Sequence, residues 1–431
     1  MNIKNAPAGT IRAALRYPAF RWLLAALAVS QVGDWLYNLA LVVLVYDRTH
    51  SALWAGVTTA ARVVPVVALG PLGGVLADRF DRRRIMITCD LARMGLMALL
   101  AVVAAAGLPI ALAPVIAAAA TAAAAPYLPC AAAVTPRVVG DADLPGANAA
   151  RSAVTGAGIV LGPALGGVLL LLGSPAAAFA LNAATFGLSA LAVLAIRARG
   201  DLNPFRPRRA ADRPAGLLRE VARGAAALRA HPAALRLVGA DIMCSTLYGT
   251  QTVLLLMVSR RIGLGAQGYG YLFAAIGVGG LLGSALAGRA SRSPRSRSVL
   301  AAALIAAGLP TLLLAVTRWP AAAIVLTGLT GLGAVLVEIL TETSLQRTLD
   351  EDVFGRAYGL AVPASLAGIV AGSVIAPGLA AALGAPGALV AVGGAVLAYA
   401  LLVLRSTAGQ PRAGDAPGAI PSAVAGAVPA R

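Results

Sequence analysis

The stretch Gly73–Arg84, "GGVLADRFDRRR", joins a glycine-rich apolar run to two aspartates and four arginines. The residues that precede it, from Ala52 onward, are almost all apolar. A basic cluster directly after such a segment is typical of the point where a transmembrane helix reaches the inner membrane surface. The stretch therefore predicts a membrane protein, and it also sets the orientation of the helix that it ends.

The composition extends this prediction to the whole chain. Of 431 residues, 59% are hydrophobic and only 12% are charged, whereas about a quarter of a soluble domain is charged. Apolar runs of about 20 residues recur, and each is long enough to cross a bilayer as a helix. We predict an all-α membrane protein with twelve transmembrane spans, at residues 20–46, 52–76, 85–106, 109–134, 152–172, 176–196, 233–258, 268–288, 299–316, 321–344, 356–382 and 386–404.

The basic residues give the predicted orientation. A net charge of +18 would suggest nucleic acid in a soluble protein, but here most Lys and Arg lie in the connections on one side of the membrane. This asymmetry predicts that side to be the cytoplasm and excludes nucleic acid as the partner. Both termini are then cytoplasmic, in a plasma (inner) membrane whose anionic lipids attract the excess charge. Four arginines fall outside: Arg48, Arg260, Arg261 and Arg318.

The segments between the spans divide the chain. We expect a cytoplasmic N-terminal tail at 1–19, a six-helix half at 20–196, a cytoplasmic linker at 197–232, a second six-helix half at 233–404 and a disordered tail at 405–431. In the linker, Ala215–Ala230 carries its apolar residues on one helical face. This pattern predicts an amphipathic helix at the inner membrane surface, which either links the halves or binds a partner.

The two halves resemble each other in sequence. The segment "AGIVLG" at Ala157–Gly162 recurs as "AGIVAG" at Ala367–Gly372, 210 residues later. The same offset relates Gly73 to Gly283, Ala77 to Ala287, Arg79 to Arg289 and Arg82 to Arg292. An internal repeat of six spans is a signature of transporters, in which the substrate site lies between the repeats.

The opening stretch resembles the motif of the major facilitator superfamily at the loop between the second and third helices. Its residues here are Gly74, Asp78, Arg79 and Arg82. The family's usual glycine is replaced by Asp81, as in the drug and siderophore exporter branch. The segments Leu144–Gly158, Ala178–Phe186 and Leu345–Leu360 also look like the enterobactin-exporter-like and macrolide-exporter-like drug efflux branch. The resemblance covers residues 20–404 and implies the major facilitator fold, in two pseudo-symmetric six-helix halves.

This motif is expected to act in gating. Asp78 lies at an inner helix end, where it can meet the positive N-terminus of a facing helix, and the arginines can pair with acids across the two halves. The alternative is that the arginines only set the topology, which we favour for Arg83 and Arg84. The second-half copy keeps Gly283 and Arg289 but has Gly288 in place of Asp78.

A second motif, "GAGIVLGPALGG", occupies the fifth predicted span. Gly158, Gly162 and Gly166 recur every four residues and share one helical face, Gly167 widens it, and Pro163 loosens the helix. Small residues at this spacing allow close helix contact in lipid. The segment resembles the superfamily's antiporter motif, which implies an exporter.

The sequence also limits the possible energy sources for transport. A Walker A loop needs a lysine, and the chain's one lysine is Lys4 in the N-terminal tail, so we expect an ion gradient rather than bound ATP to drive transport. Many drug–proton antiporters carry an arginine in the fourth span. Residues 109–134 carry no charge, which leaves the route of proton coupling open.

Charged residues inside the predicted spans are the candidate site, because each costs about 3 kcal/mol or more to insert. Asp34 and Arg62 lie about equally far from the turn between the first two spans, which predicts an ion pair near the midplane with Asp34 as the coupling acid; a purely structural pair is the alternative. Asp90 and Arg93 are predicted to pair along their own helix. Cavity-lining and coupling residues are predicted to be Asp34, Arg62, Gln31, Tyr37, Asn38 and Glu338.

These observations predict a monomeric secondary transporter, and not an enzyme, that exports a drug-like or secondary-metabolite compound by alternating access, with protons as the coupling ion. The alternatives are a siderophore exporter and, in another class, a transport-inactive membrane sensor or scaffold. Neither His50 nor His231 has the setting of a metal ligand, and we expect no cofactor. The sequence does not name the substrate.

Overall fold

The computed structural model describes residue 7 and residues 9–172, 174–196, 231–293, 296–348 and 351–405. These residues form helices and no strand. The first set of helices is α1 (Ile11–Ala14), α2 (Pro18–Thr49), α3 (Ala52–Arg79), α4 (Arg82–Ala105), α5 (Leu112–Ala124), α6 (Tyr127–Val138), the short 3₁₀ helix η2 (Asp141–Asp143), α7 (Leu144–Leu172) and α8 (Pro175–Ala195). The second set is α10 (Pro232–Arg261), α11 (Gly265–Ala290), α12 (Ser296–Leu313), α13 (Pro320–Thr348) and α14 (Glu351–Arg405).

Each predicted span coincides with a helix or part of one. The fourth span is divided into α5 and α6, and α14 covers the last two spans, which meet at Gly384 in a non-helical conformation with φ 70° and ψ 166°. Eight of the described helical segments are long and apolar enough to cross a membrane, and Ala52–Val66 and Arg297–Leu313 are shorter apolar helices. The prediction of an all-α membrane protein is confirmed.

Polar side chains fix where several helices begin. The hydroxyls of Ser51 and Ser174 accept hydrogen bonds from backbone N–H groups in the first turns of α3 and α8. Asp81 does the same for α4, accepting from the N–H of Arg84 at 2.9 Å. Such N-caps stabilise a helix by about 1 kcal/mol. The aspartate that replaces the usual glycine of the motif is therefore the cap of α4.

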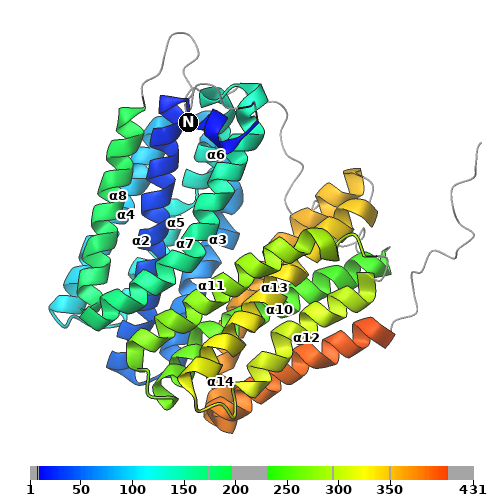
Figure 1. Ribbon diagram of the computed structural model, residues 1–431. Coiled ribbons are helices and arrows are strands. Elements are labelled where there is room, and N and C mark those ends of the chain that lie inside the picture. Colours follow the sequence, from blue (N-terminus) through cyan, green and yellow to red (C-terminus); the bar gives the residue numbers. More distant parts are fainter. Residues whose placement is uncertain are drawn as a thin grey trace, which may run out of the picture.

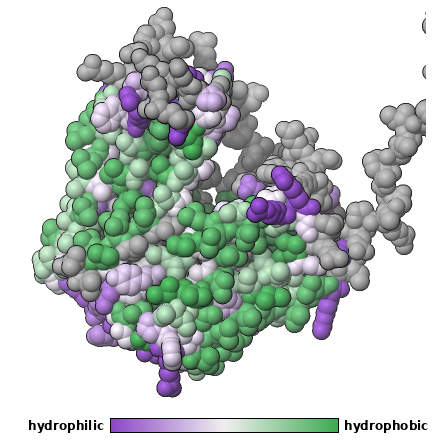
Figure 2. All heavy atoms as spheres, viewed as in Figure 1, coloured by the Kyte–Doolittle hydropathy of each residue, from purple (hydrophilic) through white to green (hydrophobic). Residues whose placement is uncertain are grey.

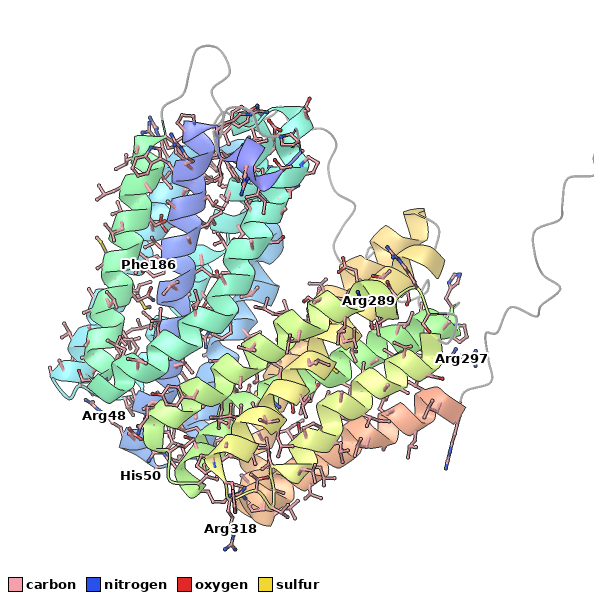
Figure 3. The ribbon with its side chains drawn as sticks, viewed as in Figure 1. Arg48, His50, Phe186, Arg289, Arg297 and Arg318 are labelled. Carbon is pink, nitrogen blue, oxygen red and sulfur yellow. The ribbon has the colours of Figure 1, made fainter. Side chains whose placement is uncertain are left out.

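The helices form two bundles, α1–α8 and α10–α14, which are shown side by side in Figure 1. The bundles contact each other through α7 with α11 and α3 with α14. They meet at the end that carries the α2–α3 connection and diverge toward the end that carries the N-terminus (Figure 1). The end at which the bundles meet is called the closed end, and His50 and Arg318 lie there (Figure 3). Arg289 lies at the opposite end of the second bundle (Figure 3).

The sides of both bundles are hydrophobic, and hydrophilic side chains gather at their ends (Figure 2). Large apolar side chains are exposed on these sides, including Val115, Leu128 and Leu191, each with more than 60% of its surface accessible. Exposed apolar surface on this scale is expected of helices that face lipid.

Two predicted segments, the amphipathic helix at 215–230 and the tail beyond Arg405, lie outside the described residues. The proposed domain boundaries therefore remain predictions.

Candidate functional site

A cavity of about 580 Å³ lies between the two bundles. Most of its wall comes from α10, α11, α13 and α14, and the first bundle contributes Trp35 from α2 and Gly156 from α7. Apolar residues and glycines make up most of the lining, and the polar side chains are Asp241, Ser245, Tyr248, Ser284, Glu338, Thr341, Glu342 and Ser365. An apolar cavity with a few polar groups is the usual setting for a small-molecule site.

The cavity wall is acidic. Asp241 on α10 and Glu338 and Glu342 on α13 all line it, and the hydroxyl of Ser365 on α14 donates a hydrogen bond to Asp241. No described residue forms an ion pair with any of the three. The structure thus places Glu338 in the cavity, where it was predicted, together with the aromatic rings of Trp35 and Tyr248.

The first bundle holds a separate charged cluster, in which the predicted pairing of Asp34 with Arg62 is wrong. Arg93 on α4 donates to Asp34 on α2, with Nη2 2.5 Å from Oδ1. The guanidinium of Arg93 also stacks on Phe186 of α8, 3.9 Å from the ring centroid. Phe186 lies in the middle part of the bundle (Figure 3). Asp34 and Arg62 lie about equally far from the turn between α2 and α3, and this correctly predicted that Arg62 is close to α2. It could not tell which neighbouring helix supplies the arginine that binds Asp34.

The predicted pair of Asp90 with Arg93 is also wrong, since Arg93 is bound to Asp34. Asp90 is completely buried. Its Oδ2 accepts a hydrogen bond of 2.7 Å from Ser189 on α8, and the Ser189 hydroxyl lies 3.1 Å from that of Tyr127 on α6. Its Oδ1 has no hydrogen-bond partner among the described residues.

The other predicted residues lie close to this cluster. Arg62 on α3 places its guanidinium 5.3 Å from the ring centroid of Tyr37, a distance that suits a cation–π contact. Asn38 is half-buried, and its side-chain oxygen has no described partner. Gln31 packs its side chain against Gly158 of α7. None of these four residues, nor Asp34, lines the cavity of about 580 Å³.

The glycines of the fifth span bring α7 onto α2. A Cβ atom at Gly162 would lie 2.3 Å from that of Trp35, and one at Gly158 would lie 2.4 Å from Cγ of Gln31. Gly166 meets Leu39 in the same way, at 2.7 Å. Side chains could not fit at these positions, so the glycines set the distance between the two helices. The side chain of Pro163 lies outside the described residues.

Gly167 faces the other bundle. A Cβ atom there would lie 2.9 Å from the backbone oxygen of Gln267 on α11. The glycine strip therefore serves two contacts, one within the first bundle and one between the bundles.

The motif predicted to act in gating covers the end of α3, the turn after it and the start of α4. Arg82 is buried and donates from Nε to the backbone oxygen of Ala77 at 3.0 Å. Arg83 donates to the backbone oxygen of Leu194 at the end of α8, while Arg79 is exposed. The surroundings of Gly74 and the side chain of Asp78 lie outside the described residues, so the gating role of Asp78 stays a prediction.

Two polar contacts were not predicted from the sequence. At the closed end, Arg260 at the end of α10 forms an ion pair with Asp47 at the end of α2, across the two bundles. These residues end the first helix of each half, 213 positions apart, which is close to the repeat offset. The sequence carried no signal for this pair, because a repeat relates equivalent positions but does not say which of them touch.

The second contact fastens the N-terminal segment to the first bundle. Asp143 of η2 is buried and accepts hydrogen bonds from Arg16 at 2.6 Å, the Gly9 N–H at 3.0 Å and the Tyr17 hydroxyl at 3.1 Å. The Arg16 guanidinium, followed by the Gly9 N–H, lowers the pKa of Asp143 below its ordinary value. Conversely, the hydrogen bond to Asp143 raises the pKa of Arg16.

The remaining cavity and side-chain clusters of the described residues have fewer polar or reactive groups than the cavity between the bundles. A second cavity of about 590 Å³ between α2, α7 and α8 is lined by apolar side chains and Thr185. Within the described part of the chain, no three His, Cys, Asp or Glu residues are grouped so that they could hold a metal ion. Cys89, Cys130 and Cys244 are buried, and none of the three forms a disulfide bond.

The chain resembles known proteins in its family, its sequence and its structure. A family model described as "Transmembrane secretion effector" matches residues 9–422. The chain is 26% identical over 395 residues to the enterobactin exporter EntS of Escherichia coli, covering 90% of this chain and 91% of that protein. It is also 26% identical over 373 residues to the uncharacterized MFS-type transporter YfiS of Bacillus subtilis, covering 82% of this chain and 86% of that protein.

Solved structures share the fold at low sequence identity. The nucleoside transporter NupG aligns with a TM-score of 0.72 at 12% identity, covering 89% of this chain and 98% of that one. A bacterial homolog of the human lysosomal transporter Spinster, in an inward-facing and unoccupied conformation, aligns with a TM-score of 0.64 at 14% identity and covers 90% of this chain and 95% of that one. The predicted major facilitator fold is thereby confirmed, and the count of twelve spans stays a prediction, since eight described helical segments are long and apolar enough to cross a membrane.

Proposed function

Because this chain belongs to the transmembrane secretion effector family of major facilitator transporters, we propose that it exports a drug-like or secondary-metabolite compound by alternating access, in exchange for protons. The observation that carries the proposal is the cavity between the two bundles, at the interface where repeat transporters bind substrate. The bundles are joined at one end and separated at the other (Figure 1), as alternating access requires of one of its two states.

The proposal includes an orientation. The arginine asymmetry supports a plasma (inner) membrane location with both termini cytoplasmic, so the closed end faces outward and the cavity opens to the cytoplasm. The Asp47–Arg260 ion pair then holds the outer side closed in this state. A single cysteine at Ser174 or Thr317, in a background without native cysteines, is expected to react with an impermeant thiol reagent added outside, and one at Ser293 is not. The reverse labelling pattern would refute this orientation.

The charge of the cavity bears on the substrate. Asp241, Glu338 and Glu342 line it without an ion-pair partner among the described residues, so a neutral or cationic compound with apolar surface suits it better than one with several negative charges. Trp35 and Tyr248 add aromatic surface on which a cation can stack. This favours a drug-like substrate.

A siderophore is the second candidate substrate. The matches to proteins named enterobactin exporter, at 26% identity over 90% of this chain, support it. Export profiling separates the candidates, since loss of the protein would lower secretion of a siderophore in one case and tolerance to cationic toxic compounds in the other.

The coupling is proposed to use Asp34, with Arg93 as its partner. This pair lies where α2 contacts the helices of its own bundle, and 31% of the Asp34 side chain remains accessible. The coupling role requires that water reach this accessible part of the carboxylate. Proton uptake at Asp34 would release Arg93 and alter the contact between α2 and α4, which provides a link between protonation and movement.

The experiment that tests alternating access uses the closed end. Cells that carry Asp47→Cys with Arg260→Cys, in a background without native cysteines, are treated with a short bifunctional thiol reagent, and export is profiled against untreated cells. Bridging the two bundles at this end is expected to abolish export, because the outer side can no longer open.

Each single cysteine variant, treated in the same way, is the matched control and should retain export. Unchanged export by the bridged protein would refute alternating access. A profile that is identical with and without the protein would favour the membrane sensor or scaffold.

A further inference from the structure

We propose that Asp90 is a second proton-binding site, and that Arg93 is a counter-ion shared between Asp90 and Asp34. The inference rests on the proposed proton-coupled function, but it concerns a residue that the coupling scheme above does not use. In this state Arg93 neutralises Asp34, and Asp90 is kept neutral by a bound proton.

The first argument is burial without compensation. Asp90 is 0% exposed, and an isolated carboxylate in such a place carries a large desolvation penalty that a protein avoids by binding a proton. One oxygen accepts from Ser189 at 2.7 Å, and the other has no described hydrogen-bond partner. A single neutral hydroxyl does not offset the charge of a buried carboxylate, whereas it suits a protonated carboxyl.

The second argument is the position of Arg93. Residues three apart on a helix are neighbours on its surface, with Cβ atoms about 5–6 Å apart, so the Arg93 side chain can reach either acid. In this structure it is 2.5 Å from Asp34, and it leaves Asp90 without a cation. The choice between the two acids is therefore a property of the conformation.

The third argument is that no other described cation competes for Asp90. The helices packed against α4 include α5, α6 and α8. Neither α5 nor α8 contains a charged residue. On α6 the titratable residues are Tyr127, whose hydroxyl bonds Ser189, the buried Cys130, and Arg137. Arg137 is ten positions from Tyr127 and hence about 15 Å along the helix. Cys89 on α4, Asp34 and Tyr37 on α2, and Arg62 on α3 complete the titratable surroundings, and Arg62 is placed over the Tyr37 ring.

These positions allow a proton exchange between Asp34 and Asp90 in which the number of bound protons is conserved. A proton from solvent binds the Asp34 carboxylate and breaks its ion pair with Arg93. The freed guanidinium then pairs with Asp90, whose carboxyl releases its proton to water that the change of conformation admits to this buried position. One proton is held by the two acids before and after the exchange, so the cluster passes one proton for each movement of Arg93.

The test is infrared spectroscopy of the purified full-length protein in lipid at neutral pH, which detects the C=O stretch of protonated carboxyl groups and needs no substrate. Asp90→Asn is expected to lose the intensity of one protonated carboxyl relative to the wild type. Asp34→Asn is expected to lose it as well, because Arg93 is then free to pair with Asp90. Arg93→Gln is expected to gain the intensity of one carboxyl, because both acids then bind protons.

The matched control is Asp47→Asn, which removes an exposed acid and should leave the band unchanged. A band that Asp90→Asn does not reduce would overturn the proposal, and so would one that survives in Asp34→Asn. If Asp90→Asn does not fold, the protonated-carboxyl band of Asp34→Asn and Arg93→Gln still decides whether the proposal holds. Because transport is not measured, failure here leaves the proposed export intact, and failure of export leaves this proton site intact.

Discussion

The two halves of the molecule share their packing but not their charges. At the repeat offset of 210, Gly162 on α7 corresponds to Gly372 on α14. A Cβ atom at Gly162 would lie 2.3 Å from Cβ of Trp35 on α2, and one at Gly372 would lie 2.1 Å from the backbone oxygen of Thr246 on α10. Each glycine therefore brings together the equivalent pair of helices in its own half, α7 with α2 in the first half and α14 with α10 in the second.

The charged residues at the same offset have diverged. Asp34 corresponds to Cys244, and Gln31 corresponds to Asp241. The first half pairs its acid with an arginine inside the bundle, while the second half directs Asp241 into the cavity. The shared glycines preserve a fold, and under the proposed function the divergent charges would place proton chemistry in one half and substrate contact in the other.

The largest expected effect comes from breaking the pair in the first half. Removing one partner of a buried ion pair costs about 3–5 kcal/mol, and the partial exposure of Asp34 places Arg93→Gln at the lower end of this range. Asp241→Asn in the second half is expected to change stability by less than about 1 kcal/mol, because that acid has no described ion-pair partner to lose. Thermal unfolding in detergent measures both variants.

Arg62→Gln is the control for the loss of an arginine. Its cation–π contact with Tyr37 is worth about 0.5–2 kcal/mol, so it should destabilise less than Arg93→Gln. The opposite order would restore Arg62 as the partner of Asp34.

The next largest effect tests whether the two halves pack their helices through equivalent glycines. Gly162→Ala and Gly372→Ala should each lower the free energy of unfolding by about 1–3 kcal/mol, because the added methyl group overlaps the facing helix. Gly95→Ala on α4 is the control, since no atom lies within 4 Å of the added Cβ, and alanine should stabilise that helix by up to about 1 kcal/mol. If only one of the two paired glycines proved sensitive, the halves would not share their packing.

A smaller effect is expected where the two halves meet. Asp47 and Arg260 are exposed at the closed end, and exposed ion pairs contribute about 0.2–1 kcal/mol. Asp47→Asn should therefore raise the population of the outward-open state at most about fivefold. Spin labels at Leu53 and Trp319, on the two halves, report this as a longer distance.

The charge-swapped double variant, Asp47→Arg with Arg260→Asp, should restore the original distance distribution. A distribution that Asp47→Asn leaves unchanged would show that the ion pair does not bias the closed end.

The smallest effect is local to the first half. The offset places Val353 at the position of Asp143, so this carboxylate is not repeated at that offset in the sequence. Because the folded-state pKa of Asp143 is lowered, its stabilising contribution is complete above the unfolded pKa of about 3.9. It is lost as the pH falls through the lower folded-state pKa.

Hydrogen exchange of residues 9–16 should therefore stay slow from neutral pH down to about pH 4 and rise below it. In Asp143→Asn exchange should be faster throughout, without this acid transition. Asp141→Asn, at an exposed neighbouring position, should behave like the wild type. An acid transition that persists in Asp143→Asn would assign it to another group.

The positions of the helices could be read from the sequence, but their partners could not. Runs of apolar residues predicted helices where the structure has them, because a bilayer requires continuous helices of about 20 residues. The glycine spacing predicted a close helix contact without identifying α2 as the facing helix. Asp81 was recognised as a departure from the motif, yet its function as the cap of α4 depends on where that helix starts.

The sequence by itself determined that this protein spans a membrane as a repeated set of helices, which places the basic residues on one side and identifies the few charges inside the spans. Only the tertiary structure decided that Arg93 binds Asp34, that Asp90 is left with Ser189, and that Glu338 shares a cavity with Asp241. The physical reason is that hydrophobic length and charge asymmetry are properties of single helices. An ion pair depends on the rotation and tilt of two helices, which are set by side chains packed along their whole contact.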